Sequence, residues 1–223
     1  MKNTLLLVGL VSLFTLPLYA QDETEKTAPE QEEIPMAADV DYETGLWLEA
    51  VHAFQKELND FYASEEESPM EAEDRAKFEG HPFFPIAIKY RVSATFTRTP
   101  DSKPFQMKTS TTRLPIYQKY GHLTFTLEDS TFQLNVYQNH NLKNVAGYEN
   151  YLFLPYNDQT NGDTSYGGGR YIDMEIQEGD TWIIDFNKSY NPYCAYSKKY
   201  SCPIPPVENF MNIAIHAGVK FVY

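Results

Sequence analysis

The chain has 223 residues and carries 31 acidic against 18 basic side chains, which gives a formal net charge of −13 at pH 7. No stripe of lysine and arginine is present to neutralise phosphates, so this charge balance argues against nucleic acid as a partner. Aromatic residues make up 15% of the chain, with 17 tyrosines, and this composition favours strands with half-buried faces.

Residues 1–20 have the order of a secretory signal peptide. Lys2 precedes an apolar run from Leu5 to Leu16, and cleavage is expected after Ala20. The run is short for a bilayer span, and Gln21 stands where a lipoprotein needs cysteine, so we expect no stable membrane anchor. The sequence therefore predicts an exported protein, periplasmic or extracellular.

Residues 21–45 hold nine acidic side chains and one lysine, a like-charged and weakly apolar composition that predicts a disordered spacer. The remaining stretch, 46–223, is long enough for a single domain with its own core. Apolar residues at spacings of three, four and seven predict an amphipathic helix over 46–61. A short second helix is expected after it, with Ser68 as N-cap and Pro69 at its first position.

After Pro85 the apolar period changes to two, which is typical of half-buried strands. Strands are predicted at 89–97, 105–111, 113–119, 122–128, 131–138 and 151–155. Crossover helices are absent from this pattern, which favours antiparallel pairing. The predicted fold is mainly β within the α+β class: an antiparallel β-sandwich or partly open barrel with one or two N-terminal helices.

Two more strands, 170–176 and 181–187, are predicted to form a hairpin. A connection of two or four residues would place Arg170, Asp185 and Asn187 on one face, with Arg170 within reach of the Asp185 carboxylate. One interpretation is a structural ion pair that closes one end of the sheet. The other is an anion clamp, because a planar guanidinium suits carboxylate or phosphate.

Cys194 and Cys202 lie in a segment dense in asparagine, proline and tyrosine. In an exported protein two cysteines at this separation are most simply a disulfide, with free thiols or a redox pair as alternatives. Four ligands with zinc spacing are missing, and the spacing of Asp173, Asp185 and Glu208 does not demand a cation. No metal and no other cofactor is predicted.

The motifs GGGRYID, DFNKSYNPYCAYS and CPIPPVEN resemble the bacterial and archaeal family named domain of unknown function 1684. The resemblance extends from SPMEAEDRAKFEGHPFFPI through YLFLPYNDQTNGDTSYGGGRY to the closing AGVK, and it covers roughly residues 50 to 220. It implies a single domain, often exported, and no activity. The hallmark residues it implies are Arg170, Tyr171, Asp173, Asp185, Asn187, Asn191, Tyr193, Cys194, Tyr196, Cys202, Pro203, Pro205, Glu208, Asn209 and Lys220.

Three functions remain open. The favoured one is a monomeric binding module for a small anionic or polyhydroxylated ligand, because polar residues cluster beside the long polar loop 157–169. The second is a hydrolase in which Asp173, Asp185 or Glu208 acts as base or metal ligand and Arg170 stabilises negative charge; no catalytic residue is assigned. The third is a structural or interaction protein. The candidate ligand-binding residues are Arg170, Tyr171, Asp173, Asp185, Asn187, Asn191, Tyr193, Glu208, Asn209 and Lys220.

Overall fold

A computed structural model describes residues 42–222, so the predicted signal peptide and most of the acidic segment lie outside the described residues. Helix α1 (Tyr42–Ala63) begins four residues before the predicted start, and the short helix α2 (Ala72–Arg75) follows it. The strands are β1 (Arg91–Arg98), β2 (Phe105–Gln106), β3 (Ile116–Leu127), β4 (Ser130–Asn139), β5 (Tyr151–Tyr156), β6 (Arg170–Glu175) and β7 (Thr181–Asp185). None of the helices within residues 42–222 combines the length and apolarity that crossing a bilayer requires.

The predicted start of the second helix was wrong. Glu71, and not Ser68, occupies the N-cap position of α2. The hydroxyl of Ser68 instead donates to the carbonyl of Tyr62 at 2.7 Å and accepts from the backbone N–H of Met70. Ser68 therefore stabilises the turn that follows α1, a local bond that competes with helix capping.

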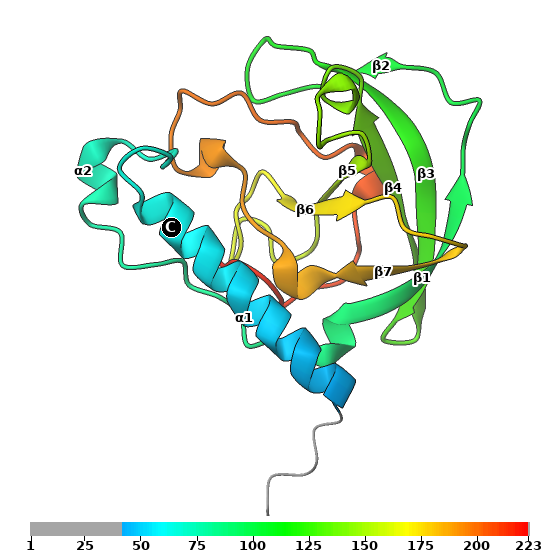
Figure 1. Ribbon diagram of the computed structural model, residues 1–223, viewed down its shortest axis with the longest axis horizontal. Helices are drawn as coiled ribbons and strands as arrows, with labels where there is room; N and C mark the ends of the chain where they lie inside the picture. The colour runs from blue at the N-terminus through cyan, green and yellow to red at the C-terminus, as the bar shows by residue number, and fades with distance from the viewer. Residues whose placement is uncertain (1–41, 223) are drawn as a thin grey trace, which may run out of the picture. The chain divides into compact units, whose positions relative to one another are not determined.

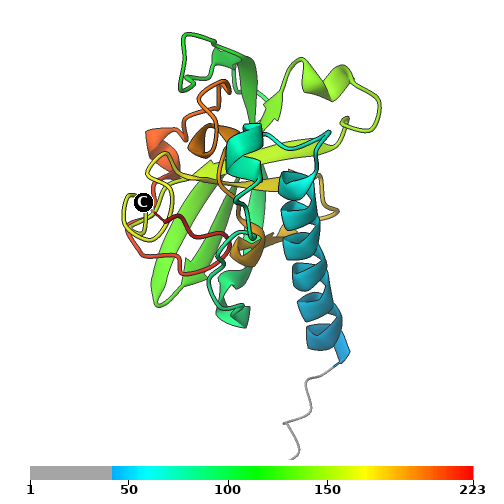
Figure 2. The same ribbon diagram turned by 90° about the vertical axis from the view of Figure 1, so that its left-hand side faces the viewer.

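The seven strands form one antiparallel sheet in the order β6-β5-β4-β3-β1-β7, with β2 paired to β3. Figure 1 shows this sheet curling into a half-barrel, and Figure 2 shows α1 beside it as a separate layer. The prediction of a mainly β fold with an N-terminal helix is confirmed, and the single curled sheet matches the partly open barrel.

Strand β3 is continuous where two strands were predicted. Its register with β4 shifts between Lys119 and Gly121. A Cβ at Gly121 would lie 2.3 Å from the ring of Phe96 and 2.6 Å from the carbonyl of Thr97, so only glycine fits there. The irregularity bends the strand without ending it, which lets the sheet curl.

The strands bury different residues on their two faces. The larger cluster, here called the inner core, includes Leu152, Leu154 and Tyr156 of β5 and Ile172 and Met174 of β6. Phe153 of β5 and Tyr171 of β6 alternate with these residues and belong to a second cluster, here called the outer cluster. It contains Met107, Tyr117, Tyr137, Phe153, Tyr171 and Cys202.

The predicted hairpin of 170–176 with 181–187 was wrong, although both strands exist. β6 pairs with β5, and β7 pairs with β1, at opposite ends of the strand order. The side-chain amide of Gln177 accepts from Ile183 N–H at 2.9 Å and donates to Ile183 C=O at 3.2 Å. It thus satisfies backbone groups at the β7 edge that a hairpin neighbour would otherwise bond.

Because the hairpin does not form, the prediction that Asp185 shares a face with Arg170 was also wrong. Trp182 and Ile184 are the β7 residues that belong to the inner core with Ile172. Asp185, which alternates with them, therefore does not share a face with Arg170. The predicted Arg170–Asp185 pair does not form.

Arg170 instead pairs with Asp158 in the interior. Its Nη2 lies 2.7 Å from Asp158 Oδ2, and both side chains are 0% exposed. The guanidinium also donates to the carbonyls of Ile215 and Ala217, which belong to the closing segment of the chain. Asp158 Oδ1 accepts from Thr160 and from the N–H of Ile215. Buried charges need such partners, so this pair fastens β6, the 157–169 loop and the closing segment together.

Replacing Arg170 by methionine should lower the free energy of unfolding by about 3–5 kcal/mol, because Asp158 would be left as an uncompensated buried charge. Urea unfolding followed by circular dichroism measures this change. Lys56→Met, which breaks the exposed pair with Asp60, is the control and should leave the unfolding midpoint nearly unchanged. Equal, small losses in both variants would contradict the role given to Arg170.

Candidate functional site

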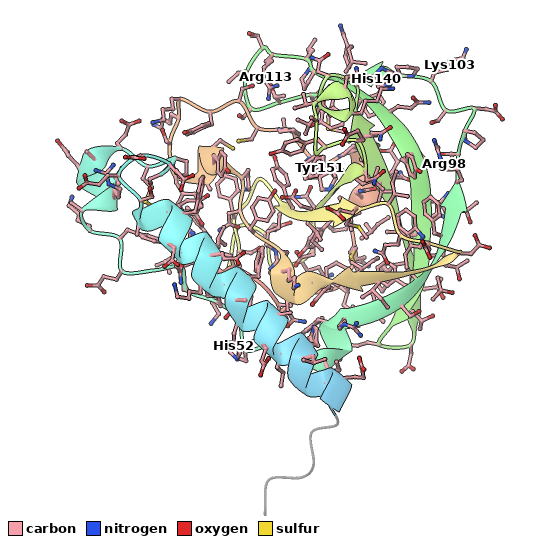
Figure 3. All side chains as sticks on the ribbon, in the orientation of Figure 1. His52, Arg98, Lys103, Arg113, His140 and Tyr151 are labelled. Carbon is pink, nitrogen blue, oxygen red and sulfur yellow. The ribbon has the colours of Figure 1, made fainter. Side chains whose placement is uncertain are left out.

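A cavity of about 330 Å³, here called the tyrosine pocket, lies on the outer-cluster side of the sheet. Its walls are mainly aromatic, and they come from β3, β5, β6, the loop 142–148 and the segment 190–203. The lining residues are Tyr117, Leu142, Tyr148, Tyr151, Phe153, Tyr171, Asp173, Tyr190, Pro192, Tyr193, Tyr200, Ser201, Cys202 and Pro203. Tyr151 is the first residue of β5, and Figure 3 shows it well separated from the exposed His52 on α1. Apolar walls with a few polar groups are typical of small-molecule sites.

The pocket is built by alternation along two neighbouring strands and by one loop. Tyr171 and Asp173 point away from the inner core because Arg170 and Ile172 point into it. The backbone N–H and C=O of Tyr171 bond to those of Tyr190, and the Tyr171 hydroxyl donates to the carbonyl of Pro203. The segment 190–203 is thereby attached along β6 and closes one side of the pocket.

Asp173 is the carboxylate of this pocket. Its Oδ1 accepts hydrogen bonds from the hydroxyls of Tyr151 at 2.6 Å and Tyr190 at 2.8 Å. The residue is exposed, and among residues 42–222 no group donates to Oδ2. Desolvation by the surrounding protein raises the pKa of Asp173, while the two tyrosine hydrogen bonds oppose that rise. The carboxylate is held firmly on one oxygen and offers the other.

The tyrosines around Asp173 stay protonated. Burial raises the pKa of Tyr151 and of Tyr190, and the nearby Asp173 carboxylate raises both further. Burial also raises the pKa of Tyr171. These hydroxyls are therefore hydrogen-bond donors and not bases.

Two thiols lie at the edge of the pocket. Cys202 lines it, and the backbone N–H of Cys194 donates to Cys202 Sγ at 3.1 Å. Both cysteines are free thiols in the structure. A hydrogen bond from the Cys202 thiol lowers the pKa of Cys194 to about 6, and the same bond raises the pKa of Cys202. Cys194 is thus the thiol that ionises first.

A second cavity, here called the edge pocket, has a volume of about 500 Å³ and lies between β6, β7 and α1. Asp173 and Asp185 both line it. Asp185 Oδ2 accepts from the indole N–H of Trp47 at 2.7 Å, and Oδ1 accepts from the backbone and side-chain N–H groups of Asn187. Asp185 therefore holds α1 against β7 and has little capacity left for a ligand.

The other predicted site residues do not gather around the tyrosine pocket, except Tyr193, which lines it and is 37% exposed. Three asparagines are buried and satisfy backbone groups: Asn187 at Ala87, Asn191 at Lys220, and Asn209 at Asn135 and Pro155. Glu208 and Lys220 line two further cavities. Within residues 42–222, no three His, Cys, Asp or Glu side chains are grouped to hold a metal ion.

Sequence reasoning missed Tyr151 and Tyr190, the two residues that bind Asp173. Tyr151 begins a strand whose apolar run predicted burial on both faces, and Tyr190 stands among several tyrosines in a turn-rich segment. The abundance of tyrosine was the available signal. It did not show which rings would meet, because they come from separate strands.

A curled antiparallel half-barrel with a tyrosine-lined pocket outside its inner core defines the class of protein. The chain belongs to the family described as Protein of unknown function (DUF1684), which matches residues 76–220, so the resemblance found in the sequence is confirmed. A solution NMR structure of an uncharacterised protein from Haloarcula marismortui is 33% identical, with a TM-score of 0.64. The match covers 80% of this chain and 96% of that one. No curated protein matches the chain.

The raised pKa of Asp173 predicts a pH dependence of stability. Between its ordinary value of 3.8 and the raised value, the folded state holds a proton that the unfolded state has lost. The contribution of Asp173 to the free energy of unfolding should therefore fall as pH rises through that window, and Asp173→Asn should gain stability relative to the wild type over the same window. Urea unfolding from below pH 3.8 to neutral pH measures the difference.

Tyr151→Phe is a second variant for this experiment. It removes a hydrogen bond that holds down the pKa of Asp173, so that pKa should rise further. The window should then extend to higher pH. A constant difference between Asp173→Asn and the wild type at every pH would contradict the raised pKa.

Proposed function

We propose that the protein is a binding module for a small polyhydroxylated ligand, and that the ligand occupies the tyrosine pocket. The observation that carries this proposal is the Asp173 carboxylate, exposed in an aromatic pocket and bonded on only one of its oxygens. Ring faces pack against the C–H groups of such a ligand, while Oδ2 accepts from its hydroxyls. The polar group is fixed before binding, so little ordering is required.

An anionic ligand has less support than a polyhydroxylated one. Arg170, the residue expected to bind an anion, is 0% exposed and paired with Asp158. The residues that line the tyrosine pocket include one carboxylate and no lysine or arginine. An anion in this pocket would meet Asp173 without a compensating charge.

The same lining favours binding over glycoside hydrolysis. Most glycosidases place two carboxyl groups on either side of the bond they cleave. Asp173 is the single acid among the described residues that line the tyrosine pocket, and Asp185 is engaged with Trp47. A polyhydroxylated ligand would therefore be held and not cleaved.

Titration with monosaccharides and linear polyols, followed by calorimetry and by NMR of the tyrosine ring signals, tests this function. At least one compound should bind and shift the pocket resonances. Asp173→Asn should weaken that binding about tenfold or more, because hydrogen bonds to a charged group are stronger than neutral ones.

Glu208→Gln is the matched control, since it removes an exposed carboxylate that lines a different cavity. It should leave the affinity unchanged. Failure of every compound to shift the pocket resonances, or equal affinity in Asp173→Asn and the wild type, would reject the proposed function.

We also propose that the protein is exported and that Cys194 and Cys202 form a disulfide there. The signal-peptide pattern of residues 1–20 supports export, although that segment lies outside the described residues. The N–H of Cys194 already contacts Cys202 Sγ, and the lowered pKa of Cys194 favours the attacking thiolate. The two thiols would lose two protons and two electrons to the disulfide of an exported oxidoreductase, which becomes a dithiol.

Purification from the exported fraction under non-reducing conditions should give a chain without residues 1–20 and two mass units lighter than the reduced form. Alkylation before and after reduction, followed by mass spectrometry, measures both properties. Ser197→Ala, in the loop between the cysteines, should keep the disulfide, and Cys194→Ser should leave one alkylatable thiol. Two freely alkylated thiols in the exported wild type would reject the disulfide.

A further inference from the structure

Three tyrosine hydroxyls near Asp173 already donate their hydrogens within the protein, so toward a ligand they can act only as acceptors. The hydroxyl hydrogens of Tyr151 and Tyr190 are both directed to Asp173 Oδ1, and that of Tyr171 is directed to the Pro203 carbonyl. What they leave toward a ligand is oxygen lone pairs. Asp173 Oδ2 adds a further acceptor. A ligand group that binds at Asp173 and these three hydroxyls must therefore supply hydrogens or positive charge.

The charge at the pocket has one sign. None of the residues lining the tyrosine pocket is a lysine or an arginine. Arg113, labelled in the loop at the top of Figure 3, lies nearby, but it is exposed and its guanidinium donates to the carbonyl of Ser201. The whole chain carries −13, which raises the local concentration of cations. Asp173 is thus a carboxylate without a cationic partner among the described residues.

The rings around this carboxylate suit a cation as well. Tyr193 and Tyr200 meet at a centroid distance of 5.2 Å and an angle of 64°, so the two rings present differently oriented surfaces. Phe153 and Tyr171 meet edge to face at 4.7 Å. Aromatic faces attract ammonium groups through the ring quadrupole, and sites of this composition recognise quaternary ammonium ligands.

We propose that the ligand of the tyrosine pocket carries an ammonium group, which lies against Asp173 and the surrounding tyrosine rings. This inference rests on the proposed function, since it names the charged part of the polyhydroxylated ligand. The ligand class is an amino alcohol or amino sugar. A bound ammonium group also opposes the desolvation that raises the pKa of Asp173.

Choline and 3,3-dimethylbutan-1-ol test the charge directly, because they have nearly the same shape and differ in a quaternary nitrogen or carbon. Each is titrated into the full chain by calorimetry and by NMR of the tyrosine rings. Choline should bind about tenfold or more tightly than the neutral alcohol, as expected when a cation meets aromatic faces and a carboxylate.

Variants separate the contributions of charge and rings. Asp173→Asn should abolish most of the preference for choline, while Glu175→Gln, an exposed acid on the same strand that lines the edge pocket and not the tyrosine pocket, should retain it. Tyr193→Leu changes a 37% exposed ring without altering charge, and it should also weaken choline binding. This second variant keeps the test decisive if Asp173→Asn folds poorly.

The outcomes separate the ammonium assignment from the more general proposal that the tyrosine pocket binds a ligand. Equal binding of choline and the neutral alcohol, or an undiminished preference in Asp173→Asn, overturns the ammonium assignment and leaves a ligand-binding pocket. Binding of neutral polyols in preference to choline has the same meaning. If neither probe nor any polyol perturbs the pocket, both proposals fail.

Discussion

The buried pair of Arg170 and Asp158 is the interaction on which the rest of the structure depends. Neither charge could remain in the interior alone, so each fixes the position of the other. Arg170 starts β6, Asp158 lies in the preceding loop, and the guanidinium also binds carbonyls of Ile215 and Ala217. Ile215 and Ala217 belong to the inner core, so this one side chain attaches the end of the chain inside the curl of the sheet.

Because the inner face of the sheet is filled in this way, the polar side chains that a ligand could reach lie on the opposite face. Residues alternate along β6, so the strand that buries Arg170 presents Tyr171 and Asp173 outward. Gly169 lets the backbone before β6 pass close to the Tyr156 carbonyl. Its φ is +89°, and a Cβ at this position would lie only 2.8 Å from that oxygen. The structural pair and the pocket carboxylate are therefore consequences of one strand and its pleat.

Local features of the sequence predicted more than its long-range ones. Period-two alternation identified β1 and β4, and strand parity gave the faces within β6, because each of these depends on neighbouring residues only. The partner strands could not be derived: β6 pairs with β5 and β7 with β1, and that choice reversed the predicted face of Asp185. The partner of Arg170 was missed for the same reason, since Asp158 stands in a loop that strand parity does not describe.

The tyrosine pocket depends on a loop to a greater degree than on the sheet. β6 has β5 on one side, and on the other it meets the loop through the backbone pair of Tyr171 and Tyr190. Tyr190 then donates its hydroxyl to Asp173, and Cys202 of the same segment lines the cavity. The segment 190–203 thus covers an exposed strand edge, supplies a wall and orients the carboxylate. Because its two cysteines lie in contact, the residues that shape the pocket are also those that a covalent link would hold in place.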